Sequence, residues 1–167
     1  MISIENAVTK MISNCNGDLY DVNHFMKVWA YAKTIGQLEG LDERTQQTLE
    51  LAAIVHDIAC PGLREEYGSA PGHLQEQHGP ALVREFYKDA EMDDEMLERI
   101  CYLVEHHHTT TGVDGLDYQI LLEADFLVNA GENNMSAEAI AEYKKNVFKT
   151  QSGIRLLDDL YGDKEEE

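Results

Sequence analysis

The residues best suited to chemistry in this sequence are His56 and Asp57, which follow one another at the end of the apolar segment AAIVHDIA. Burying an imidazole and a carboxylate costs free energy unless a partner compensates. An aspartate near a helix C-terminus also opposes the helix dipole. A divalent metal ion would satisfy both groups, so we expect other helices to supply further ligands.

Two residues distant in sequence are candidates for those ligands. Asp125 lies in the segment ILLEADFLV, which is apolar nearly all round and so predicts a buried central helix. A carboxylate there must be neutralised or paired. His24 lies on the shoulder of an apolar stripe, a position that by itself favours a solvated side chain.

The remaining histidines differ in the direction that helical periodicity assigns to them. On a helical wheel His107 falls within an apolar stripe, His106 points nearly opposite, and His108 lies at the edge. The wheel therefore predicts that His107 is the inward member of the triplet. His78 precedes an apolar run and faces either solvent or the site.

The elements that must position these groups all read as helices. Helical spacing extends from about residue 3 to 17, 21 to 40, 42 to 57, 80 to 86, 93 to 108, 117 to 128 and 136 to 148, with a short segment near 156 to 161. Because no stretch shows convincing strand alternation, we predict an all-α bundle of about six to eight helices. Residues 1–162 are expected to form one domain and residues 163–167 an acidic, frayed tail. The stretch 58–72, rich in proline and glycine, is expected to be a loop near the site.

The composition limits the classes of partner. The chain has 167 residues and a net charge of −19, with only 13 basic residues. Nucleic acid binding requires clustered basic side chains, so we expect no nucleic-acid partner, although a small phosphorylated substrate fits. We find no apolar run of the roughly 20 residues that a spanning helix needs and nothing like a signal peptide. Three widely spaced cysteines fit reduced thiols, and we therefore expect a cytoplasmic protein without membrane contact.

The order His … His-Asp … Asp over consecutive helices resembles the HD domain superfamily of metal-dependent phosphohydrolases, in particular its small single-domain hydrolases. The matching segments are NHFMKVWAYA, AAIVHDIA, CYLVEHHH and ILLEADFLVNA. The metal ligands of the family match four residues here: His24, His56, Asp57 and Asp125. Some members hold a second metal through two further histidines, for which His78 and His107 fit. The resemblance implies one or two divalent ions of iron, manganese, nickel, cobalt, zinc or magnesium.

The resemblance also implies a reaction. A metal would activate water for attack on a small phosphorylated compound, in particular a nucleotide, with His56, Asp57 and Asp125 as the catalytic group. We predict phosphate contacts from Lys27, which lies one helical turn after His24, and from Arg64 in the segment after the pair. Many family members have a lysine soon after His-Asp, whereas Cys60-Pro61 stands here, so the subfamily does not assign the substrate.

Two alternative functions fit the same residues. A site with two irons on this scaffold can activate dioxygen, as in HD-type oxygenases. A catalytically silent module could instead sense a nucleotide. The complete set of ligands favours an enzyme over a sensor.

Overall fold

The computed structural model describes residues 2–162, and this part of the chain contains nine helices and no strand. The all-α prediction is therefore confirmed, with one helix more than expected. The helices are α1 (Ile4–Asn14), α2 (Leu19–Leu38), α3 (Glu43–Val55), α4 (Cys60–Tyr67), α5 (Gly72–Tyr87), α6 (Asp94–His106), α7 (Leu116–Glu132), α8 (Ala137–Val147) and α9 (Gln151–Tyr161). The predicted tail 163–167 lies outside the described residues.

Most of these helices begin where a short polar side chain caps the first turn. At six helix starts the side chain of the N-cap residue accepts a hydrogen bond from a backbone N–H of the first turn, which would otherwise lack a partner. These residues are Ser3, Asp18, Asp42, Asp93, Ser136 and Thr150. Asp18 caps α2, so that helix begins at Leu19, two residues before the start expected from the sequence.

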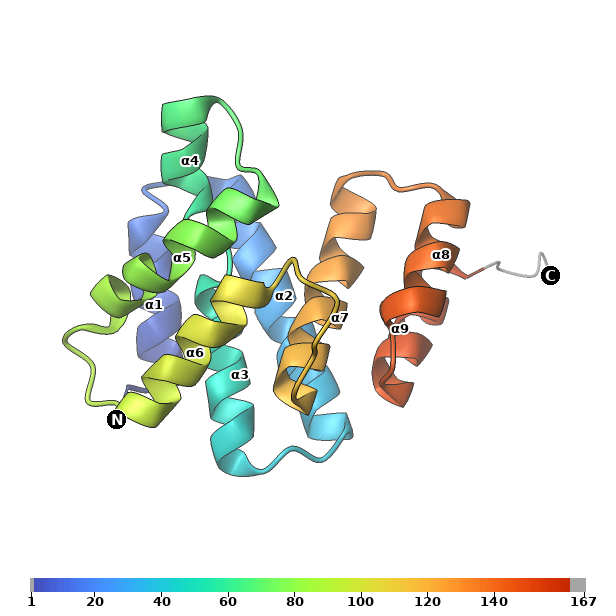
Figure 1. Cartoon of the computed structure of the whole chain (residues 1–167), viewed down its shortest axis with the longest axis horizontal. Coiled ribbons are helices and arrows are strands. Elements are labelled where there is room, and N and C mark those ends of the chain that lie inside the picture. The colour runs from blue at the N-terminus through green and yellow to red at the C-terminus, as the bar shows by residue number, and fades with distance from the viewer. Residues whose placement is uncertain (1, 163–167) are drawn as a thin grey trace.

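The centre of the molecule consists of α2, α3 and α7, which pack against one another. Every residue of α7 from Asp117 to Val128 is buried, as its apolar sequence predicts. The α5–α6 pair packs on α3, α1 covers another side of α3, and α9 lies against α7 (Figure 1). The end of α3 packs against α7, and the Tyr118 hydroxyl near the start of α7 donates to the His106 carbonyl at the end of α6.

Two features between residues 58 and 87 differ from the sequence-based prediction. The expected loop contains α4, because Pro61 sits in a first turn, where its missing N–H is harmless, and Gly68 ends the helix at φ 74°. Helix α5 begins at Gly72, well before Pro80, so this proline lies in the middle of the helix and not in its first turn. In Figure 1, α4 stands at the top, clear of the bundle.

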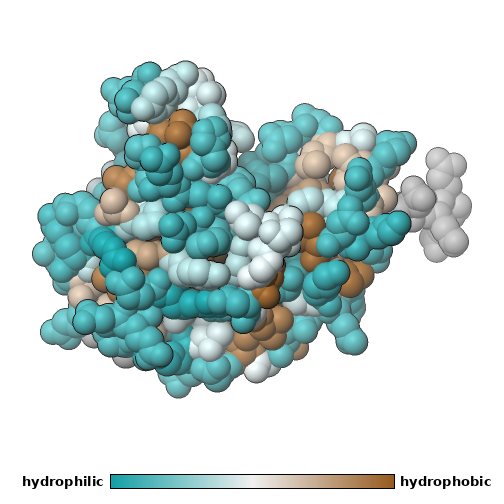
Figure 2. Space-filling view, viewed as in Figure 1, coloured by the Kyte–Doolittle hydropathy of each residue, from teal (hydrophilic) through white to brown (hydrophobic). Residues whose placement is uncertain are grey.

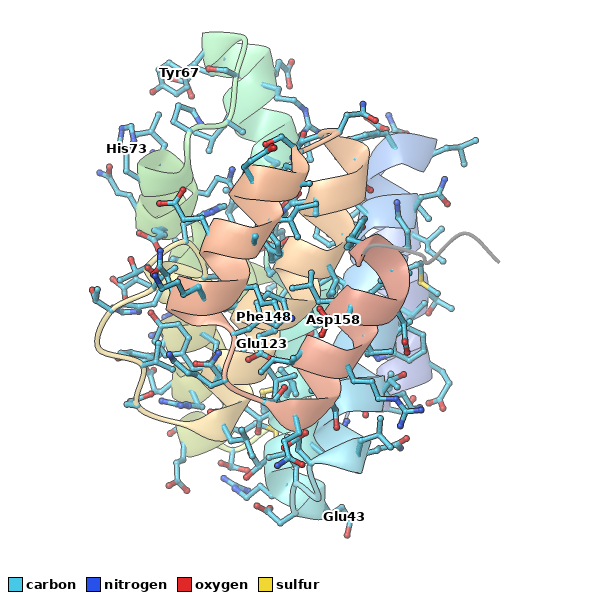
Figure 3. The ribbon with its side chains drawn as sticks, turned by 90° about the vertical axis from the view of Figure 1, so that its right-hand side faces the viewer. Glu43, Tyr67, His73, Glu123, Phe148 and Asp158 are labelled. Atoms are coloured by element: carbon cyan, nitrogen blue, oxygen red, sulfur yellow. The ribbon has the colours of Figure 1, made fainter. Side chains whose placement is uncertain are left out.

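A buried carboxylate holds the last two helices against α7. Glu123 is fully buried and accepts hydrogen bonds from the Thr150 backbone N–H at 3.0 Å and from its hydroxyl at 2.5 Å. Since Thr150 caps α9, the carboxylate lies at the positive end of that helix dipole. In Figure 3, Glu123 and Phe148 lie between α8 and α9.

The surface is largely hydrophilic, as the many charged residues of the sequence lead us to expect. The face shown in Figure 2 is largely hydrophilic, with small separate hydrophobic patches. None of the helices between residues 2 and 162 combines the length and apolar character needed to cross a lipid bilayer. Cys15, Cys60 and Cys101 are free cysteines.

Candidate metal centre

Helix α3 ends so that two adjacent side chains can reach one place. Successive residues on a continuous helix point about 100° apart. Here the helix ends at Val55, His56 is its C-cap residue, and a turn runs to Cys60, where α4 begins. The His56 and Asp57 side chains therefore both approach His24, at 3.1 Å for the His56 Nε2 atom and 3.2 Å for the Asp57 Oδ2 atom, each measured to His24 Nε2.

The three inward histidines each have their Nδ1 atom next to an oxygen. His56 Nδ1 lies 2.8 Å from the Ala53 carbonyl, and His107 Nδ1 lies 2.7 Å from the Val104 carbonyl. His24 Nδ1 lies 2.8 Å from Glu132 Oε2. Because carbonyl and carboxylate oxygens only accept, each Nδ1 carries a proton and donates it. The Nε2 atoms are thereby left to bind a metal or another proton.

The Nε2 atoms of His24 and His56 face each other in a buried space, where two unprotonated nitrogens would repel. They lie 3.1 Å apart, and two lone pairs at that distance repel unless a cation or a proton lies between them. Asp125 Oδ1 lies 3.4 Å from both Nε2 atoms and is buried without a hydrogen-bond partner. An orphaned carboxylate oxygen beside two imidazole nitrogens fits a divalent metal ion of the transition series.

Asp57 joins this group to a second one. Its Oδ2 atom faces His24, while its Oδ1 atom lies 3.0 Å from His107 Nε2. Among the described residues, two sets have ligand atoms close enough to hold a metal ion: His24, His56 and Asp57, and Asp57, His107 and His108. Asp57 is the residue common to both sets. His107 is buried, as the helical wheel predicts.

The charges of the group set its pKa values. Burial disfavours the protonated form of His24, but the adjacent Asp125 and Asp57 carboxylates outweigh burial and raise the pKa of His24 to about 11. Burial likewise opposes ionisation of Asp57 and Asp125, yet the neighbouring histidines hold the pKa of both carboxyls well below its usual range. The metal-free group is therefore a set of ionised carboxylates with a protonated histidine, a charge pattern in which a cation can replace the proton.

His108 differs from its neighbour His107. Burial of the ring, followed by the charge of His107, lowers the pKa of His108 to about 4. Its Nε2 atom lies 2.9 Å from Gln75 Oε1, and its backbone N–H donates to Glu76 Oε1 at 3.0 Å. A neutral imidazole is the form that binds a metal.

The other predicted site residues lie around this group or apart from it. His78 is exposed on α5 and belongs to neither set of ligand atoms, so the structure does not bring it to the centre. Lys27 Nζ lies 2.6 Å from Glu132 Oε1. Arg64 bonds to Asp21 on α2, one turn before His24. Both predicted phosphate contacts are thus engaged with carboxylates.

Sequence reasoning missed two residues at the centre. Glu132 is the last residue of α7, past the apolar run, and reads as an ordinary polar helix end. Its position seven residues after Asp125 is the one signal that could have placed it on the same face. His108 comes close because the chain turns after α6, a direction that a helical wheel does not give.

Comparison with known families agrees with this geometry. The HD domain model matches residues 21–144, from α2 into α8. The chain therefore belongs to the HD domain family. The match contains every residue of both candidate ligand sets.

A solved structure shares the fold. It is described as a predicted HD superfamily hydrolase from an uncultured Thermotogales bacterium and superposes with a TM-score of 0.63. The two sequences are 23% identical, and the alignment covers 95% of this chain and 83% of that one. No curated protein matches the chain.

Proposed function

We propose that this protein is a metal-dependent phosphohydrolase that acts on a small phosphorylated compound, in particular a nucleotide. The observation that carries the proposal is the approach of the two Nε2 atoms of His24 and His56 to 3.1 Å beside the unpartnered Asp125 oxygen. Membership of the HD family and the name of the structural neighbour as a hydrolase support it. A net charge of −19 favours a small substrate over a polyanion.

The described residues supply what such a reaction needs. His24, His56, Asp57 and Asp125 would hold one ion, and His107 with His108 would complete a second site on the other oxygen of Asp57. A divalent ion held there lowers the pKa of water and draws charge from a phosphate oxygen. Among the four ligands of the first ion, Asp57 is the most exposed, with 20% of its side chain accessible, so we place the proton acceptor there.

The phosphate contacts remain part of the proposal. Arg64 and Lys27 are charge-paired with Asp21 and Glu132, so a phosphate must compete with a carboxylate for either side chain. The Arg64 guanidinium can serve both because it has five N–H donors. We therefore propose Arg64 as the first phosphate contact.

The test is a substrate screen with a matched pair of variants. Phosphomonoesters, nucleotides and dinucleoside polyphosphates are incubated with the chain and Mn²⁺, Co²⁺, Ni²⁺, Fe²⁺, Zn²⁺ or Mg²⁺, and released phosphate or nucleotide is measured. We expect metal-dependent hydrolysis that Asp57→Ala abolishes and that Asp89→Ala, at an exposed position, leaves unchanged. Circular dichroism confirms that both variants are folded.

Other outcomes would point to the alternatives. Equal hydrolysis by the parent and Asp57→Ala would refute the site. Two irons per chain with dioxygen consumption on substrate addition would indicate the oxygenase, for which the shared Asp57 carboxylate is equally suitable. Full metal occupancy with nucleotide binding and no turnover would indicate the sensor.

A further inference from the structure

Helix α7 contacts both ring nitrogens of His24. Asp125 Oδ1 lies 3.4 Å from the Nε2 atom, and Glu132 Oε2 lies 2.8 Å from the Nδ1 atom. Asp125 and Glu132 are seven residues apart, which is about two helical turns and places them on one face. Both nitrogens of the His24 imidazole on α2 are therefore contacted by carboxylates of a single neighbouring helix.

His24 differs in this respect from the two other inward histidines. His56 and His107 donate their Nδ1 proton to a carbonyl three residues earlier in their own helix, so any peptide backbone provides the partner. His24 donates to a carboxylate 108 residues away in the sequence. A charged acceptor makes the opposite nitrogen a stronger metal ligand than a neutral one does.

The Glu132 side chain is itself held in place. Its Oε1 atom accepts from Lys27 Nζ at 2.6 Å, and its Oε2 atom lies 3.4 Å from the Tyr20 hydroxyl. The side chain is 11% exposed. Lys27 lies three residues after His24, so one turn of α2 carries both the imidazole and the cation that orients its partner.

We propose that Glu132, held by Lys27, is a positioning residue for His24, an inference that rests on the proposed metal centre. Glu132 keeps the proton of His24 on Nδ1, which leaves Nε2 free to face Asp57 and Asp125, and its charge strengthens Nε2 as a ligand. Lys27 then acts on the centre through Glu132 and not by contacting a phosphate directly.

Metal affinity tests this role without reference to activity. Co²⁺ dissociation constants are measured by competition with a chelator for the parent, Glu132→Ala, Glu132→Gln and Lys27→Met. The control is Glu142→Gln, an equal change of charge at an exposed position on α8. We expect Glu132→Ala to lose about 10- to 100-fold in affinity, the range for partners of metal-binding histidines. Glu132→Gln and Lys27→Met should lose less, and the control nothing.

A second readout reports on the ring itself. In the Zn²⁺-loaded parent, long-range ¹H–¹⁵N NMR should show a slowly exchanging Nδ1 proton on His24, and this signal should broaden or vanish in Glu132→Ala. A residue that only stabilised the fold would not change it. If Glu132→Ala does not fold, Glu132→Gln retains the shape and carries the test.

The possible results separate this inference from the proposed function. If the parent binds Co²⁺ and Glu132→Gln and Glu132→Ala bind it equally well, with the Nδ1 signal intact, the positioning role is refuted and the metal centre stands. If the parent itself binds no divalent ion, the metal centre is refuted and this inference fails with it.

Discussion

Replacing Glu123 by alanine should release the α8–α9 pair from α7. The fully buried Glu123 carboxylate accepts four hydrogen bonds. Its Oε1 atom accepts from the backbone N–H groups of Lys149 and Thr150, at 2.7 and 3.0 Å, and from Gln119 Nε2 at 2.7 Å. Its Oε2 atom accepts from the Thr150 hydroxyl. Alanine removes every one of these acceptors.

The magnitude follows from the donors that lose their partner. Leaving a buried donor unsatisfied costs about 1 to 3 kcal/mol. The two backbone N–H groups alone therefore give about 2 to 6 kcal/mol, and water entering the space recovers a part. We expect Glu123→Ala to lower the free energy of unfolding by about 3 to 5 kcal/mol, a large share of the roughly 5 to 15 kcal/mol of a typical domain. Glu123→Gln retains one acceptor oxygen and should lose about 1 to 2 kcal/mol.

Urea unfolding followed by circular dichroism measures both variants, with Glu142→Ala on the exposed side of α8 as the control. Hydrogen exchange should show the Thr150 and Gly153 amides losing protection in Glu123→Ala before the amides of α3 do. The reasoning is refuted if Glu123→Ala unfolds within about 0.5 kcal/mol of the parent, which is the range of an ordinary surface substitution.

Three further predictions concern the metal centre and helix packing. Since the pKa of His24 in the metal-free group is about 11, this histidine is protonated at pH 7, and Co²⁺ binding should release about one proton and tighten with rising pH. Calorimetry in buffers of different ionisation enthalpy measures the proton release. A binding enthalpy that does not depend on the buffer would contradict this prediction. Addition of Co²⁺ at about one hundred times its dissociation constant should stabilise the fold by about 2.7 kcal/mol, which corresponds to about 5 to 11 °C in Tm, and a chelator should reverse the shift; an unchanged Tm would argue against the centre. A Cβ atom on Gly79 would lie 2.6 Å from Val104 Cγ1, so Gly79→Ala should separate α5 from α6 and lower the free energy of unfolding by about 1 to 2 kcal/mol. A Cβ atom on Gly62 meets open space, so Gly62→Ala should not lower it. Equal urea midpoints for the two variants would refute this packing argument.

Local sequence patterns predicted the parts of this structure that depend on burial. The apolar surroundings of Asp125 predict a buried carboxylate, and it is buried; the helical wheel selects His107 from three consecutive histidines, and it is the buried one. Both outcomes follow from periodicity, because a helix that is apolar on one face must turn that face to the core.

The parts that were missed depend on how separate helices meet. The approach of Glu132 to His24 results from the crossing of α2 and α7, which no local pattern encodes. His78 was instead included wrongly. Its position in the sequence matched the second-metal histidines of the family, but its side chain is exposed on α5. Helix α4 lies where the sequence predicts a loop, because its eight residues are too few to establish a helical period.

The contacts of α7 with His24 also determine when the metal centre can assemble during synthesis of the chain. The contact between His24 and Glu132 spans 108 residues, so α1 to α6 leave the ribosome before either carboxylate of α7 is available. Closing so long a segment is an entropic cost that must be met before the contact forms. Apolar packing of α7 on α2 and α3 therefore has to assemble the centre before a metal can bind with its full ligand set. Tight metal binding by this chain would consequently be a sign that folding is already complete, and metal supply would not limit how fast the chain folds.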